Sequence, residues 1–419
     1  QEQIEEAEQA RQEAYQRRML TVAKSMAIKS QQATDDPYLR ALLAYQAFKF
    51  NDRYNGIRNE VDIYSGLYQS LKTILGSSYN VYSGHSNAVR SVVFLPNTSS
   101  FISAGSDGRV LKWNLNSENK DYATLLSGRN VIDKVQVTPD GNWLLAAENR
   151  SGLLLMNLTA GVPTVNLMSG NEENIRSIAV ANDNNTVYTA GVSNFVEIWQ
   201  INRRTGDIFI ETESRVNSIS ISPNGQILAG GTRSGQTIIW QISSDPTSNV
   251  IFSDPNNAVQ CVQFSPDGRY LTCGTLNGDV LVFRADNFEI ERVLSGHEAR
   301  VTEIDFSPDG SLMAITSYDG KVLFWDMNRL HQPPIEMNDN AGFVFTVSFS
   351  SDGRYLVSGS ADEDRLVSRP TASSILASRI CSLVSRNLTK EEWETYIGND
   401  IPYQKTCENF QSYEIGVKQ

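Results

Sequence analysis

A repeat with a period of 42 or 43 residues is the feature that most constrains how this chain folds. Equivalent turn positions, most of them in Pro-Asp-Gly-like sequences, follow one another at distances of 43, 42, 42, 43, 42 and 43 residues. These positions are Pro96, Pro139, Ala181, Pro223, Pro266, Pro308 and Ser351. A period of about 40 to 45 residues with three or four strands per unit is that of a β-propeller blade.

Each unit contains three strand-like segments separated by turns, and the first segment of every unit follows the same pattern of apolar residues. The first segments are Val89–Phe94, Ile132–Val137, Ile175–Val180, Val216–Ile221, Val259–Phe264, Val301–Phe306 and Val344–Phe349. The third segments end near Trp113, Met156, Trp199, Trp240, Phe283, Trp325 and Ser368. We therefore expect an all-β fold, a seven-bladed propeller over residues 79–370.

Closure of the ring follows from the same pattern. The fourth strand of each blade comes from the segment that leads into the next unit, so residues 79–83 would complete the seventh blade. This arrangement hides a sheet edge that would otherwise pair with other chains. Truncation at about residue 84 is expected to destabilise the whole ring.

Short motifs within the units resemble the tryptophan-aspartate (WD) repeat family over roughly residues 79 to 370. Gly84-His85 and Gly296-His297 match the opening dipeptide of that family, and Trp325-Asp326 matches its closing dipeptide. Trp113-Asn114, Trp199-Gln200 and Trp240-Gln241 are degenerate closing dipeptides.

The resemblance implies a hydrogen-bonded network that locks a blade. In the family, a His, a Ser or Thr, an Asp and the Trp are bonded in series. The full set in the first blade is His85, Ser103, Asp107 and Trp113. The sixth blade has His297, Asp319 and Trp325, but Ile315 stands where the hydroxyl belongs, so its network should be shortened. The other blades are expected to rely on apolar packing.

Helices are predicted on both sides of the propeller. Residues 1–33 are rich in Gln, Glu and Arg and predict a helical stalk, either a coiled coil or a solvated single helix. Residues 34–78 predict a helical hairpin connector, with Asp36 as N-cap before Pro37. Residues 371–419 predict a helical C-terminal tail, in which Thr389 and Glu392 form a capping box.

Both flanks resemble the segments around propellers in bacterial signalling NTPases of the STAND group. The connector shares Asp36-Pro37 and Leu42-Leu43-Ala44 with those proteins, and the tail shares Glu391-Glu392-Trp393 and Pro402-Tyr403. In that group an NTPase, often followed by a membrane-spanning helix, precedes the connector. The chain has no Gly-x-x-x-x-Gly-Lys-Ser/Thr loop, and a membrane anchor is expected upstream of Gln1.

Composition and residue chemistry argue against catalysis. The formal net charge of −12 disfavours binding to nucleic acid. Two of the three histidines, His85 and His297, are assigned to blade locks, so no catalytic, cofactor or metal site is expected. A hydrolase or lyase with its site in the central channel is kept as a third hypothesis.

The state of the four cysteines, free or in disulfides, depends on the cellular compartment of the protein. Cys261 and Cys273 flank one turn, so they either face each other across a hairpin or stay buried as free thiols. Cys381 and Cys407 would form a disulfide if the chain lies outside the cytoplasm. We expect a periplasmic or membrane-associated location, with the cytoplasm as the alternative.

Partner-binding residues are predicted on the rim where the innermost strands begin. Arginine and aromatic side chains favour carboxylate recognition and binding hot spots. The candidates are Arg90, Arg176, Arg215, Arg300, Phe343 and Phe345. The alternative is that these arginines pair with acidic residues of neighbouring blades and that the phenylalanines plug the channel.

The leading functional hypothesis is a non-catalytic propeller that binds a protein or senses a ligand, as the recognition module of a larger bacterial signalling or membrane-anchored protein. The N-terminal helix is expected to support oligomerisation. A structural scaffold subunit of a bacterial envelope or secretion complex is the alternative.

Overall fold

The computed structural model describes residues 2–33, 35–77, 80–159, 174–243, 246–340, 342–361 and 365–410, together with the backbone of residues 165–167. The chain forms two compact units. One consists of residues 81–369, and the other combines residues 1–80 with residues 370–419. No helix in the described ranges has both the length and the hydropathy needed to cross a membrane.

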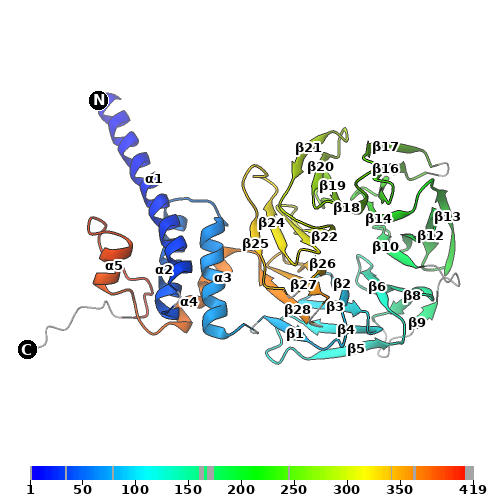
Figure 1. Ribbon diagram of the computed structural model, residues 1–419, viewed down its shortest axis with the longest axis horizontal. Coiled ribbons are helices and arrows are strands. Elements are labelled where there is room, and N and C mark those ends of the chain that lie inside the picture. The colour runs from blue at the N-terminus through cyan, green and yellow to red at the C-terminus, as the bar shows by residue number, and fades with distance from the viewer. Residues whose placement is uncertain are drawn as a thin grey trace, which may run out of the picture. The chain divides into compact units, whose positions relative to one another are not determined.

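The larger unit is a seven-bladed β-propeller. Its seven sheets each have four antiparallel strands and are arranged in a ring around a central channel, as Figure 1 shows. Blade one consists of β2 (Val89–Phe94), β3 (Ser100–Gly105), β4 (Arg109–Asn114) and β5 (Tyr122–Ser127). Blade two consists of β6 (Ile132–Val137), β7 (Trp143–Glu148), β8 (Gly152–Asn157) and β9 (Val165–Leu167). Blade three consists of β10 (Ile175–Val180), β11 (Thr186–Gly191), β12 (Phe195–Gln200) and β13 (Thr205–Glu211). Blade four consists of β14 (Val216–Ile221), β15 (Ile227–Thr232), β16 (Gln236–Gln241) and β17 (Ser248–Ser253). Blade five consists of β18 (Val259–Phe264), β19 (Tyr270–Thr275), β20 (Val280–Arg284) and β21 (Ile290–Leu294). Blade six consists of β22 (Val301–Phe306), β23 (Leu312–Ser317), β24 (Val322–Asp326) and β25 (Ile335–Met337). Blade seven consists of β26 (Val344–Phe349), β27 (Tyr355–Ser360), β28 (Arg365–Pro370) and β1 (Val81–Ser83).

The repeated turn between the first two strands of a blade is stabilised by its own side chains. In blade five the Ser265 hydroxyl donates to Asp267 Oδ1 at 2.6 Å, and the same carboxylate accepts from the Arg269 backbone at 3.0 Å. Gly268 has a φ of 71°, a conformation that glycine adopts without steric cost. Because these interactions are local, the turn recurs with the repeat and sets the register of each hairpin.

The N-terminal strand closes the ring. β1 pairs antiparallel with β28, with Val81 opposite Val367 and Ser83 opposite Arg365. Tyr82 is buried, and its ring contacts Trp113 at a centroid distance of 5.8 Å. The two ends of the repeat therefore meet in one sheet, as the repeat predicts. Destabilisation by truncation at about residue 84 stays a prediction.

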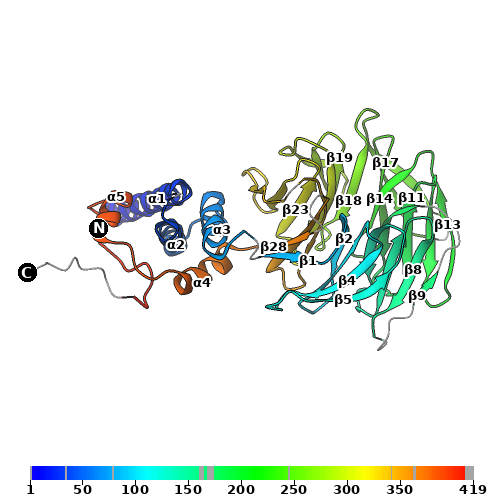
Figure 2. The same cartoon turned by 60° about the horizontal axis from the view of Figure 1, so that its bottom comes forward.

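The second unit is helical and is built from both ends of the chain. It contains α1 (Glu2–Gln32), α2 (Pro37–Arg53), α3 (Val61–Leu75), α4 (Ser373–Leu383) and α5 (Lys390–Tyr396). Met19, Ala23 and Met26 of α1 are buried, and Figure 2 shows α1, α2 and α3 side by side. Residues 2–15, in the N-terminal half of α1, are all exposed.

The segments predicted as a stalk (1–33), a connector (34–78) and a tail (371–419) belong to this one compact unit. Met19, Ala23 and Met26 bury one face of α1, so this helix is neither a separate coiled coil nor a helix solvated along its length. The tail also packs into the unit, because Trp393 contacts Phe50 of α2 at a centroid distance of 6.0 Å. A disulfide joins Cys381 to Cys407, and residues 411–419 of the tail lie outside the described part.

Cys261 and Cys273 do not face each other. The register of β18 and β19 places Cys273 opposite Val262 and Cys261 opposite Gly274. Neighbouring residues of a strand point to opposite faces, so the two cysteines enter different apolar cores. Both thiols are free and buried, and burial raises their pKa values, in the case of Cys273 to about 12.

Candidate functional site

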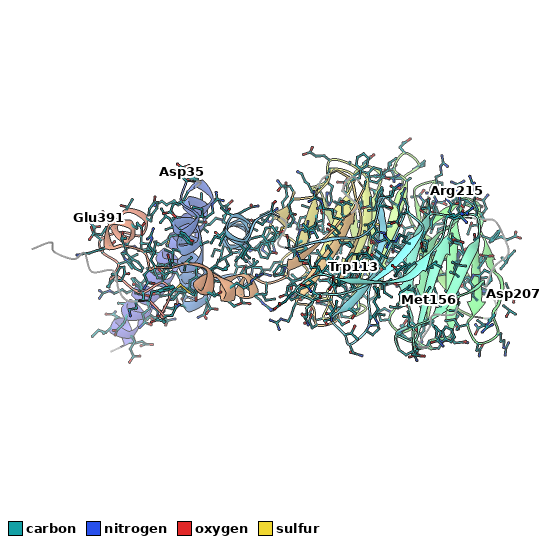
Figure 3. All side chains as sticks on the ribbon, turned by 90° about the horizontal axis from the view of Figure 1, so that it is seen from below. Asp35, Trp113, Met156, Asp207, Arg215 and Glu391 are labelled. Carbon is teal, nitrogen blue, oxygen red and sulfur yellow. A yellow bond between two sulfur atoms is a disulfide. The ribbon has the colours of Figure 1, made fainter. Side chains whose placement is uncertain are left out.

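Blade one contains a complete hydrogen-bonded lock. His85 Nδ1 lies 3.0 Å from Asp107 Oδ1, and His85 Nε2 lies 2.7 Å from the Ser103 hydroxyl. Trp113 Nε1 donates to the same hydroxyl at 2.7 Å. One neutral tautomer satisfies all four groups: Nδ1–H donates to the carboxylate, and Ser103 accepts from the indole and donates to Nε2. This lock links the entry of the blade to its third strand, on which Figure 3 labels Trp113.

Blade six contains only part of this lock. His297 Nδ1 lies 2.9 Å from Asp319 Oδ2, but Ile315 occupies the place of the hydroxyl. His297 Nε2 and Trp325 Nε1 are consequently buried without a hydrogen-bond partner. Burial lowers the pKa of His297 despite the nearby Asp319 carboxylate.

The lock of blade seven has a different chemistry, which the sequence analysis missed. Asn340 precedes Val344 by four residues, as His85 precedes Val89 in blade one. Its Oδ1 accepts from Ser358 at 3.1 Å and from Arg369 Nη2 at 3.0 Å. Arg369 takes the place of the tryptophan and is fully buried, with its charge paired to Asp339 at 2.6 Å.

Blade three also departs from the expected apolar packing. Trp199 Nε1 donates to Thr189 at 2.9 Å, and Thr189 lies 3.1 Å from Glu197 Oε2. The expectation that every blade other than one and six relies on apolar packing was therefore wrong for blades three and seven. Counting residues back from each first strand would have found Asn340, and the Trp199 spacing would have found Thr189.

A cavity of about 400 Å³ opens at the rim of the channel. It is lined mainly by the second residue of each innermost strand and by side chains that lie next to these residues along the channel. The lining residues are Arg90, Asp133, Lys134, Arg176, Asn217, Gln260, Arg300, Val301, Thr302, Glu303, Tyr318 and Phe345. We call this space the rim cavity.

Four of the six predicted partner-binding residues line the rim cavity: Arg90, Arg176, Arg300 and Phe345. Arg215 is not among the lining residues. Its Nε donates to the Val192 carbonyl at 3.2 Å, and Figure 3 labels it at the margin of the propeller. Phe343 is 46% exposed and stacks on Tyr318 at 4.4 Å beside the cavity. Tyr318, Lys134 and Glu303 were missed because they lie outside the rim positions of the repeat.

Two arginines of the rim cavity rest on aromatic rings. Arg90 lies over Phe345 at 4.5 Å, and Arg300 lies over Tyr318 at 3.7 Å. The two rings meet edge to face at 5.6 Å. With Phe343 these side chains form a continuous group, which we call the arginine–aromatic cluster. Phe345 thus packs against Arg90, and Phe343 stacks on the Tyr318 ring that carries Arg300.

The opposite part of the rim cavity carries a half-buried carboxylate and amides. Burial raises the pKa of Asp133, whereas Arg90 and Arg176 act in the opposite direction. The remaining lining there comes from Asn217 and Gln260, which are uncharged. Of the predicted arginines, Arg90 and Arg176 therefore do face an acidic residue of a neighbouring blade.

An ion pair forms the floor of the rim cavity. Lys134 of blade two pairs across the channel with Glu303 of blade six. Glu303 Oε2 also accepts from the Val347 backbone of blade seven at 3.1 Å. Below it a second space of about 220 Å³ contains Asp305, and burial raises the pKa of this carboxyl to about 7.

A belt of side chains ties neighbouring blades together around the channel. The third residue of an innermost strand accepts a hydrogen bond from a backbone N–H of the next blade. These bonds join Ser91 to Val135, Ser177 to Ile219, Ser218 to Val262, Glu303 to Val347 and Thr346 to Val92. Within the described ranges the belt lacks this bond at Lys134 and at Cys261, where the third residue is a cation or a thiol.

No three His, Cys, Asp or Glu side chains in the described ranges converge as metal ligands. Two carboxylates of the channel, Glu303 and Asp305, accept interblade hydrogen bonds from the backbone of Val347 and Phe349. The geometry fits binding at the rim.

Comparison with known proteins agrees with the geometry of the blades. A model of the second β-propeller of echinoderm microtubule-associated proteins matches residues 175–339. A model of the WD domain, G-beta repeat, matches residues 76–114 and 333–367. The larger unit is a WD-repeat β-propeller.

The curated relatives of this propeller are themselves diverse. One component of chromatin assembly factor 1 of Mus musculus is 27% identical over 183 residues, which are 42% of this chain and 28% of the relative. The LST8 homolog of Drosophila melanogaster is 26% identical over 53% of this chain and 73% of its own length. The beta subunit of the guanine nucleotide-binding protein of Oryza sativa is 25% identical over 67% of this chain and 68% of its own length. The chain thus spans less than a third of the chromatin assembly factor component.

Proposed function

We propose that this chain is a non-catalytic recognition module that captures a protein partner in the rim cavity. The observation that carries the proposal is the arginine–aromatic cluster. It gathers cationic and aromatic side chains at one mouth of the channel, in a chain whose formal net charge is −12. Arginine and aromatic residues are enriched among the side chains that dominate binding energy at protein interfaces.

The arginine–aromatic cluster is organised before a partner arrives. Arg90 is held by Phe345 and by a hydrogen bond from its Nε to Ser106 at 2.8 Å. Arg300 is held by the Tyr318 ring and donates to the Tyr318 hydroxyl. Side chains that are already ordered lose less conformational entropy on binding, which favours affinity.

We further propose that the propeller serves a larger bacterial signalling or membrane-anchored protein. Support comes from the helical unit, in which the segments before and after the propeller pack together. Both segments also resemble the flanks of propellers in STAND-type NTPases. The Cys381–Cys407 disulfide favours a periplasmic or membrane-associated location over the cytoplasm, because cytosolic thiols are kept reduced.

A structural scaffold subunit of an envelope or secretion complex is the second candidate. The exposed N-terminal half of α1 favours it, because this half offers a surface for a tether or for oligomerisation. A scaffold would hold its partners in a fixed ratio, whereas a sensor would bind them in a ligand-dependent way.

Affinity capture from a native membrane extract tests the proposal. The baits are the intact chain, the triple variant Arg90→Ala/Arg176→Ala/Arg300→Ala, and Arg215→Ala as the matched control outside the cavity. We expect one set of proteins on the intact chain and on the control that is lost from the triple variant, while the melting temperatures of the variants stay similar. Equal capture by all three baits would place recognition outside the rim cavity and contradict the proposal.

A further inference from the structure

We infer that the rim cavity recognises an extended acidic segment in which two carboxylate side chains flank an apolar one at alternate positions. This inference rests on the proposed function and specifies the chemistry of the partner. It follows from the order of groups within the arginine–aromatic cluster, from the charge of the lining and from the hydrogen-bond donors that remain for a ligand.

The order of groups around the rim is cation, ring, ring, cation. Arg90 contacts Phe345, Phe345 contacts Tyr318, and Tyr318 contacts Arg300, at 4.5, 5.6 and 3.7 Å. These side chains come from blades one, seven and six, which are neighbours in the ring. An anionic, an apolar and a second anionic side chain at alternate positions of an extended segment point to one face and match this order.

The charge of the lining leaves room for two carboxylates. Four basic side chains, Arg90, Lys134, Arg176 and Arg300, face two acidic ones, Asp133 and Glu303. Lys134 is paired with Glu303. The difference is an excess of two positive charges, which two ligand carboxylates would neutralise.

The guanidinium groups of Arg90 and Arg300 keep donors for a ligand. An arginine has five N–H donors in one plane. In the described part of the chain, Arg90 makes one hydrogen bond, to Ser106, and Arg300 makes one, to the Tyr318 hydroxyl. The remaining N–H groups lie in the plane of each guanidinium, so each guanidinium can bind a carboxylate in the two-bond arrangement.

The rest of the site suits a peptide backbone rather than a bare anion. Phe343 extends the apolar wall beyond the cavity and is 46% exposed. Asn217 and Gln260 place uncharged amides on the far side, where donors and acceptors can meet main-chain groups. A small dianion such as phosphate would leave both the apolar wall and these amides unused.

The test is selection of peptides from a random display library on the intact chain, followed by removal of binders to the Arg90→Ala/Arg300→Ala variant. We expect the surviving peptides to carry acidic, apolar and acidic residues at alternate positions. A synthetic peptide with the core Glu-Ser-Leu-Ser-Glu should bind at least about 10-fold more tightly than its Gln-Ser-Leu-Ser-Gln analogue, since each charged hydrogen bond contributes roughly 1.5–3 kcal/mol. Its affinity should fall with added salt.

Matched variants distinguish a loss of carboxylate recognition from a loss of folding. Arg215→Ala should leave the affinity unchanged, and Arg90→Lys with Arg300→Lys should weaken it, because lysine cannot bind a carboxylate through two parallel bonds. The glutamine analogue needs no protein variant, so the result does not depend on the folding of a mutant.

Two outcomes would overturn the inference in different ways. If the selected peptides depend on Arg90 and Arg300 but are not acidic, or if the glutamine analogue binds equally well, the partner chemistry is wrong and capture at the rim cavity stands. If no selected peptide depends on these arginines, both the inference and the proposed function fail.

Discussion

Blades one and six begin with the same Gly-His dipeptide and have a tryptophan on their third strand, but they differ in the side chain between the two rings. Ser103 connects His85 to Trp113 in blade one, whereas Ile315 separates His297 from Trp325 in blade six. Both blades keep the same strand pairing and register. The lock therefore adds stability to a blade whose shape is already set by strand pairing and apolar packing.

The innermost strands of these two blades differ as well. Blade one has Ser91 and Val93 where blade six has Glu303 and Asp305. Glu303 accepts the interblade bond of the belt and also pairs with Lys134. Yet both blades supply an arginine that rests on a ring in the rim cavity. The two blades thus have different interiors and present similar groups at the rim.

The largest expected change in stability follows from loss of the blade-one lock. Ser103→Ala leaves His85 Nε2 and Trp113 Nε1 buried without partners, and each unpaired group costs about 1–3 kcal/mol. We expect the free energy of unfolding to fall by roughly 2–4 kcal/mol, measured by denaturant titration. Ser127→Ala, at an exposed position of the same blade, is the control and should have little effect. A loss that matches the control would mean that the lock contributes nothing.

The next largest effect is a pH-dependent change in stability that comes from Asp305, on the channel side of blade six. Burial raises the folded pKa of Asp305 to about 7 from its usual value near 3.8, so this group stabilises the fold below pH 4 and loses that contribution as the pH rises through 7. Asp305→Asn keeps an acceptor for the Phe349 N–H, which lies 2.8 Å from Asp305 Oδ2. The variant should be more stable than the parent by about 1–2 kcal/mol at pH 8 and should lose this advantage near pH 4.

Unfolding curves of the parent and Asp305→Asn between pH 4 and 8 measure this difference. His297 acts with the opposite sign, because its lowered pKa removes stability as the pH falls below about 6.5. Taking the difference between the two proteins cancels this contribution. A constant difference across the whole range would contradict the raised pKa of Asp305.

A smaller effect is expected when blade six is given the hydroxyl of blade one. Ile315→Thr supplies a group between His297 Nε2 and Trp325 Nε1, at a buried position. The new bonds offset the lost apolar burial, and we expect a net gain of about 1 kcal/mol in the free energy of unfolding. Ile315→Val is the control, because it shortens the side chain without adding a hydroxyl, and it should destabilise. If both variants destabilise alike, the unpaired groups of blade six cost nothing.

The smallest effect tests the interblade belt. Cys261→Ser places a hydroxyl at the third position of β18, where it can accept from the backbone of blade six as Ser218 accepts from Val262 at 3.1 Å. A gain of about 0.5 kcal/mol is expected from one neutral hydrogen bond. Cys273→Ser, which lies on the other face of the same sheet, should destabilise instead. Thermal unfolding of the two variants side by side gives the sign of each.

The propeller could be predicted from the sequence because its determinants are local and repeated. The turn at Asp267 recurs every 42 or 43 residues, and each copy fixes a hairpin. The four members of the blade-one lock could be assigned because their spacing follows the family pattern. The role of Arg369 could not be predicted in this way. A buried arginine with a carboxylate partner stands in the place of the tryptophan, and the repeat pattern does not reveal such a replacement.

The candidate site was predicted only in part, for a similar reason. The rim positions of the repeat identify Arg90, Arg176, Arg300 and Phe345. They do not identify Tyr318, which reaches the cavity from the turn after the second strand of blade six. The ion pair between Lys134 and Glu303 joins residues that are 169 positions apart, and only the closed ring brings them together. The packing of Trp393 on Phe50 in the helical unit is likewise a long-range contact.

Site-specific photo-crosslinking tests the central claim, capture of a protein at the rim cavity, most directly. A photoreactive phenylalanine analogue replaces Phe343 beside the cavity or, as control, Tyr122 on β5 of blade one. The two side chains are 46% and 40% exposed. After irradiation in a native membrane extract, the account predicts a discrete crosslinked protein at position 343 that disappears when Arg90 and Arg300 are changed to alanine, and no such product at position 122. Crosslinks of the same protein at position 122 alone, or at position 343 regardless of the two arginines, would contradict it.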